Sequence, residues 1–144
     1  MAVILASSCL LGCECRYKGD GCKCDALIKL AESNTIIGVC PEQMGGLPTP
    51  RDPAERQDDK VISCAGKDVT KAYTKGAETA LYFAKLNHVD FAVMKAKSPS
   101  CGKGLIYDGT FTGNKIPGNG VTVELLNANG IPVFTEDELD QLPL

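Results

Sequence analysis

The sequence predicts an α/β fold: a single Rossmann-like domain, residues 1–144, in which helices flank a mainly parallel sheet. Two observations carry this prediction. Short apolar runs typical of buried strands alternate along the chain with amphipathic helical patterns. The 144 residues, 44% hydrophobic and 23% charged, also suit one compact core that needs no disulfide bonds to fold.

Three of the predicted strands share a feature that points to a site. Apolar runs at residues 2–6, 35–39 and 91–95 predict these strands, and Cys9, Cys40 and Cys101 follow them. The carboxyl ends of parallel strands lie at one edge of a sheet, where such folds bind their ligands. We therefore expect the three thiols to meet there, and soft thiolates favour a metal or an iron–sulfur cluster.

The remaining regular elements follow from periodicity. Apolar residues three and four apart predict helices over residues 25–32, 69–84 and 121–127, and a last strand is expected at 131–134. The helix at 69–84 carries small residues on its apolar face, so we expect it to pack close to the sheet. His88 follows that helix and is interpreted as a helix cap.

The segment between the second strand and the long helix has a different character. Residues 45–59 are rich in proline, glycine and charge, which predicts a long surface excursion without regular structure. Residues 61–65 and 67–69, separated by Gly66, are expected to form a small hairpin. Cys64 in that hairpin is interpreted as a small buried apolar residue.

Composition and charge exclude several classes of protein. The net charge of −3 provides no basic surface for long nucleic acid, although it permits an uncharged nucleobase ligand. No apolar run reaches the length of a membrane span, and the N-terminal run is short and lacks a basic flank. We expect a cytoplasmic protein that does not bind membranes.

The eight cysteines leave alternatives open. The reducing cytosol favours ligation or redox chemistry over disulfide bonds. Cys13, Cys15, Cys22 and Cys24 form a C-x-C-x6-C-x-C array, so a noncatalytic, zinc-stabilised binding module is one alternative. A thiol-based oxidoreductase is a weaker alternative because the chain has no C-x2-C motif. A phosphatase-type loop is also disfavoured, because the spacing from Cys9 to Arg16 is C-x6-R, one residue longer than the C-x5-R of those enzymes.

Several blocks of the chain, taken in order, resemble the thiouracil desulfidase family, formerly a domain of unknown function. They are SCLLG (8–12), RY (16–17), VCPE (39–42), GGLPTPR (45–51), DVT (68–70), SPSCG (98–102), IYDG (106–109) and PGNGVT (117–122). The resemblance implies a 4Fe-4S cluster held by Cys9, Cys40 and Cys101, with one iron open. It further implies that sulfur is removed by hydrolysis from a thiouracil-like nucleobase or nucleoside, with release of hydrosulfide and no net electron transfer.

Hydrolysis needs a group that moves protons at the substrate. Glu42, two residues after Cys40, is the candidate general base, and the family pattern favours Ser98 as the second catalytic residue. Ser100 flanks the third cysteine and is expected to bind the substrate ring. We expect the same role for three residues on the predicted ligand loops, namely Arg16, Tyr17 and Lys97.

Overall fold

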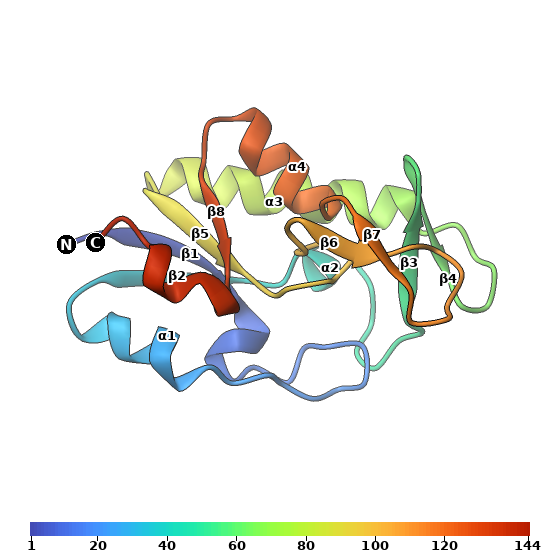
Figure 1. The fold of residues 1–144 in the computed structure, drawn as a ribbon, viewed down its shortest axis with the longest axis horizontal. Helices are drawn as coiled ribbons and strands as arrows, with labels where there is room; N and C mark the ends of the chain where they lie inside the picture. The colour runs from blue at the N-terminus through green and yellow to red at the C-terminus, as the bar shows by residue number, and fades with distance from the viewer.

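The computed structural model describes all 144 residues and has a four-stranded parallel sheet at its centre (Figure 1). The strands are β1 (Val3–Ser7), β2 (Thr35–Val39), β5 (Phe91–Met94) and β8 (Val133–Thr135), in the spatial order β2-β1-β5-β8. All three strand pairs are parallel. The predicted α/β class is therefore confirmed, and the predicted strands are present with small shifts at their ends.

Helices cover both faces of this sheet. Figure 1 shows α3 (Thr70–Leu86) and α4 (Val121–Ala128) on one face, and α1 (Asp25–Lys29) on the other. The strands are apolar throughout because alternate side chains enter opposite cores. Leu5 and Ala92 pack toward α3 and α4, whereas Ile4 and Phe91 pack with Leu10 and Leu27. Short 3-10 helices also occur, at Ser8–Leu11, Leu30–Glu32 and Glu136–Gln141.

The small-residue face of α3 serves two contacts. Ala80 and Ala84 pack against the sheet, as predicted. Nearer its start, α3 meets the short helix α2 (Pro41–Met44), which the sequence did not reveal. A Cβ on Gly76 would overlap the Pro41 carbonyl, and a Cβ on Gly45 would overlap the Ala72 carbonyl. The two helices therefore touch backbone to backbone, which fixes the segment that follows Cys40.

The prediction of irregular structure over residues 45–59 is wrong at its end. β3 (Ala54–Gln57) pairs antiparallel with β4 (Lys60–Ser63) around a turn in which Asp58 has φ 57°. Residues 67–69, which were predicted to pair with residues 61–65, form two backbone hydrogen bonds with β4. Cys64 is exposed rather than buried because it lies in the turn after β4.

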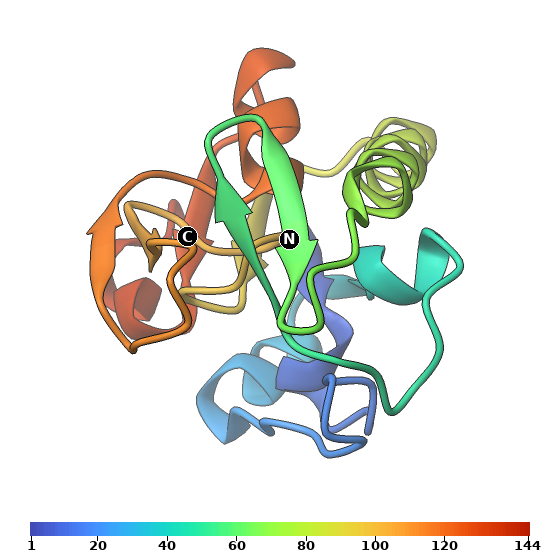
Figure 2. The same cartoon turned by 90° about the vertical axis from the view of Figure 1, so that its right-hand side faces the viewer.

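A second hairpin was also missed. β6 (Leu105–Tyr107) and β7 (Lys115–Pro117) pair antiparallel within the glycine-rich stretch before α4. Three-residue strands are too short to show a period of two in the sequence. Both hairpins lie beyond the carboxyl ends of the parallel strands (Figures 1 and 2). No helix combines the length and the apolar character needed to cross a bilayer.

Candidate active site

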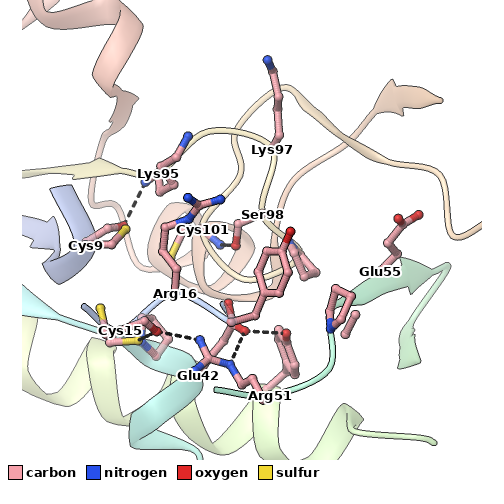
Figure 3. Close-up of a pocket in the computed structure, with 18 of the residues that line it drawn as sticks. Cys9, Cys15, Arg16, Glu42, Arg51, Glu55, Lys95, Lys97, Ser98 and Cys101 are labelled. Atoms are coloured by element: carbon pink, nitrogen blue, oxygen red, sulfur yellow. Dashed lines mark hydrogen bonds and ion pairs between the residues drawn. The ribbon is translucent and has the colours of Figure 1, made fainter. Parts of the chain in front are cut away.

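A cavity of about 470 Å³ lies at the carboxyl ends of β1, β2 and β5 (Figure 3). Cys9, Cys40 and Cys101 all line it. Cys9 follows β1, Cys40 precedes the first turn of α2, and Cys101 lies in the loop after β5. Three thiols far apart in sequence therefore meet in one cavity, as the strand pattern predicted.

A fourth thiol, that of Cys15, lies beside them. Cys15 is 4% exposed and lines the cavity. Its carbonyl oxygen accepts a hydrogen bond from the Cys40 thiol, with an Sγ–O distance of 3.8 Å. The hydrogen bond with Cys40 lowers the pKa of Cys15, but the contact with Cys9 and burial outweigh it and raise the pKa to about 11. Sequence reasoning placed Cys15 only in the zinc array.

Cys40 and Cys101 also have raised pKa values. The hydrogen bond with Cys15, followed by burial, raises the pKa of Cys40. Burial raises the pKa of Cys101 to about 12. These thiols are therefore protonated near neutral pH, and binding of a soft metal centre must release their protons.

The proposed zinc array does not assemble. Cys13 is exposed, Cys22 and Cys24 are half-buried, and none of the three lines the cavity. No three or more Cys, His, Asp or Glu side chains are placed to hold a single metal ion. A cluster has a different requirement, because each cysteine binds a different iron and the thiols need not converge on one point. The cavity thiols, three buried and that of Cys40 half-buried, fit that softer, multi-iron group.

Glu42 is held in the cavity wall by two residues from other parts of the chain. Its Oε1 accepts a hydrogen bond from Arg51 Nε at 3.1 Å and another from the Tyr73 hydroxyl at 2.8 Å. Burial, followed by the Glu42 charge, raises the pKa of Tyr73, so this hydroxyl keeps its proton and remains a donor. The carboxylate is thereby fixed through one oxygen, and Oε2 has no partner within the chain.

Arg51 connects Glu42 to the cysteine-rich loop. Its side chain is 6% exposed, and it also donates to the Cys15 carbonyl at 2.8 Å and to Thr49 Oγ1 at 2.9 Å. Sequence reasoning assigned no role to Arg51 or Tyr73. Arg51 ends the GGLPTPR block, which was the available signal, whereas Tyr73 resembles any core aromatic on a helix face.

The two predicted serines have different surroundings. Ser98 lines the cavity, and its Oγ accepts the backbone N–H groups of Ser100 and Cys101 at 3.0 and 2.9 Å. Ser98 therefore shapes the turn that presents Cys101, and its hydroxyl proton stays free to be donated. Ser100 does not line the cavity. It is fully buried, and its hydroxyl bonds to that of Thr122 at 2.9 Å.

The predicted substrate-binding residues Arg16, Tyr17 and Lys97 line the cavity. The Arg16 guanidinium lies 5.8 Å from the centre of the Tyr17 ring, and the Tyr17 carbonyl accepts the Arg51 backbone N–H. Lys97 is exposed and has φ 71°. Lys95, to which the sequence analysis assigned no role, also lines the cavity and is paired with Glu136 at 2.7 Å.

The two missed hairpins complete the cavity wall. Glu55 of β3, Tyr107 of β6 and Phe111 of the β6–β7 loop all line the cavity. Glu55 is 9% exposed and accepts backbone hydrogen bonds from Gly109 and Phe111. These contacts were not predicted, because β3, β6 and β7, which bring the three residues together, show no period in the sequence.

Comparisons with known proteins identify relatives of this chain. The 2-thiouracil desulfurase family model matches residues 4–138. The chain is 41% identical over 150 aligned positions to the uncharacterized protein YbbK of Bacillus subtilis (strain 168), covering 97% of this chain and 99% of that protein. It is also similar to the solved structure of the 4Fe-4S-dependent thiouracil desulfidase TudS, with TM-score 0.94, 44% identity and coverage of 99% of this chain and 95% of that one. The chain therefore belongs to the 2-thiouracil desulfurase family.

Proposed function

We propose that this protein is an iron–sulfur-dependent desulfidase that removes sulfur from a small thiolated nucleobase or nucleoside. One observation carries the proposal: Cys9, Cys40 and Cys101, from three separate segments of the chain, line the cavity that also contains Glu42. The similarity to TudS, over 99% of the chain, supports the same chemistry. A cavity of about 470 Å³ also has the size of a small-molecule site.

In this proposal Cys9, Cys40 and Cys101 hold a 4Fe-4S cluster, and one iron has no protein ligand. The cluster, when bound, supplies a Lewis acid that draws electron density from the thiocarbonyl group. The net reaction exchanges sulfur for oxygen: a thiocarbonyl and water give a carbonyl and hydrogen sulfide. It needs no oxidant or reductant, so we propose a non-redox hydrolysis.

Glu42 moves the protons in this proposal. Arg51 and Tyr73 bind its Oε1 and fix the carboxylate in one orientation. Oε2 then accepts the proton of the attacking water. The Ser98 hydroxyl, which accepts two backbone N–H groups, donates its own proton to the water or to the substrate. Arg16, Tyr17 and Lys97 bind the substrate where they line the cavity. Ser100 supports the wall from behind through Thr122.

The test compares two triple variants that each lack three thiols. Wild-type protein, a Cys9→Ala/Cys40→Ala/Cys101→Ala variant and a Cys13→Ala/Cys22→Ala/Cys24→Ala control are reconstituted anaerobically with iron and sulfide. We expect about four irons per chain in the wild type and in the control, and almost none in the first variant. Iron and acid-labile sulfide are measured, followed by sulfide release from thiouracils.

Two outcomes would contradict the proposal. The first is stoichiometric zinc that the Cys9/Cys40/Cys101 variant keeps and the Cys13/Cys22/Cys24 variant loses. That result would indicate a zinc-stabilised binding module instead. A loaded wild-type protein that releases no sulfide from any thiouracil would contradict the desulfidase activity itself.

A further inference from the structure

Glu55 is a buried carboxylate in the cavity wall that takes no part in the reaction described above. It lies in β3, is 9% exposed and forms no ion pair. Its Oε1 accepts the backbone N–H of Gly109 at 3.0 Å and that of Phe111 at 3.2 Å. In Figure 3 it lies across the drawn cavity from Cys9 and Cys15.

The second oxygen of Glu55 is left open. Oε2 forms no hydrogen bond within the chain. Arg56 Nε is the one fully buried side-chain polar atom without a partner, so Oε2 is not fully buried. Oε2 is therefore accessible, and the cavity is the space that Glu55 lines. Burial of a carboxylate is costly unless hydrogen bonds satisfy it, so a donor on a bound ligand would complete the coordination of this oxygen.

The surrounding loop holds this carboxylate in place. Gln57 Nε2 donates to the Gly109 carbonyl at 3.0 Å, so two side chains of β3 clamp the same turn. Gly109 has φ 92°, and a Cβ there would lie 2.8 Å from the Arg56 carbonyl oxygen. Phe111 has φ 57°, a conformation that non-glycine residues rarely adopt, and this residue lines the cavity. These contacts fix the Glu55 carboxylate and the backbone of the turn at Gly109 and Phe111.

We propose that Glu55 is a specificity-determining residue that accepts a hydrogen bond from the substrate, on the side of its ring remote from the thiocarbonyl, while the Phe111 ring covers the ring face. This inference rests on the proposed function. In 4-thiouracil the group opposite the thiocarbonyl is the N1–H, and in 4-thiouridine the sugar with its hydroxyls occupies that position. The shared chemistry is an N–H or O–H donor, and 1-methyl-4-thiouracil has none there.

The test uses the cluster-loaded protein and these three compounds. In the wild type we expect the KM for 1-methyl-4-thiouracil to exceed that for the better of the other two by about ten-fold or more, since a buried acceptor is then left unpaired. The compound with the lower KM identifies the donor as ring N–H or sugar hydroxyl. Glu55→Gln keeps an acceptor for Gly109 and Phe111 but can present an amide donor to the cavity. We expect it to bring the KM ratio close to one, with a smaller effect on kcat.

The matched control is Glu124→Gln, which removes a carboxylate that pairs with Arg56 outside the cavity. It should leave the KM ratio unchanged, and all proteins should have equal iron content and similar unfolding temperatures. A wild type that turns over the three compounds with equal KM would overturn the inference without any variant, as would a Glu55→Gln enzyme that keeps the wild-type ratio. No sulfide release from any compound would instead contradict the proposed function, and this inference with it.

Discussion

At the scale of single residues, the site depends on contacts that hold Glu42 in one orientation. Glu42 and Arg51 form an ion pair whose side chains are 17% and 6% exposed. Such a pair is favourable only when further hydrogen bonds satisfy both partners. The Tyr73 hydroxyl donates one to Glu42, and Arg51 donates one to the Cys15 carbonyl. Removing a single partner should therefore affect both stability and activity.

The Tyr73→Phe substitution tests this contact. It removes one hydrogen bond to a largely buried carboxylate, so the free energy of unfolding should fall by about 1–3 kcal/mol. The kcat for sulfide release should fall as well, because Glu42 loses one of its two fixed contacts. Denaturant unfolding and initial rates measure the two effects. Tyr82→Phe, an exposed tyrosine on the same helix, is the control. Equal stability and kcat in the two variants would refute the positioning role.

At the scale of elements, the contact between α2 and α3 links the long helix to the site. The short helix α2 begins directly after Cys40 and carries Glu42, and it meets α3 where Gly76 and Gly45 permit backbone contact. The sequence predicted α3 from its period but not α2, because four residues after a proline show no helical period.

Gly76→Ala should be destabilising although alanine is the better helix former. The added methyl group would displace the Pro41 carbonyl and with it α2, so the free energy of unfolding should fall by roughly 1–3 kcal/mol, the usual cost of overpacking. Iron content after reconstitution should also fall, because Cys40 borders the displaced helix. Thr74→Ala, at an exposed position of α3, is the matched control. Unchanged unfolding in Gly76→Ala would mean that α2 moves away without cost.

At the scale of the whole molecule, the C-terminal segment anchors the loop that carries Cys101. Glu136 binds Lys95 and the Ala96 N–H, and Glu138 binds Lys103 through both carboxylate oxygens at 2.9 and 3.0 Å. The two ion pairs thus hold the loop on both sides of Cys101. The final 3-10 helix that provides them was not predicted from the sequence.

These pairs predict a pH dependence of stability. The hydrogen bond from Lys103 holds the pKa of Glu138 below its ordinary value. The unfolded chain therefore binds this proton more readily, so the stabilisation is complete above the ordinary glutamate pKa and is lost as pH falls through the folded value. The free energy of unfolding should fall more steeply in the wild type than in Glu138→Gln between about pH 6 and about pH 3. The free energy of unfolding is measured by denaturant titration at each pH. An equal fall in the wild type and in Glu138→Gln would contradict this prediction.

The sequence by itself determined the elements that have a local period and the thiols that follow them. The strands β1, β2 and β5, the helix α3, and the expectation that Cys9, Cys40 and Cys101 meet all came from patterns within a few residues. Only the tertiary structure decided which side chains hold and complete the site. Glu55 reaches Phe111 across 56 residues of chain, Tyr73 reaches Glu42 across 31, and Ser100 turns into the core toward Thr122. Such contacts depend on how distant segments pack, and packing between segments has no period along the chain for a sequence pattern to reveal.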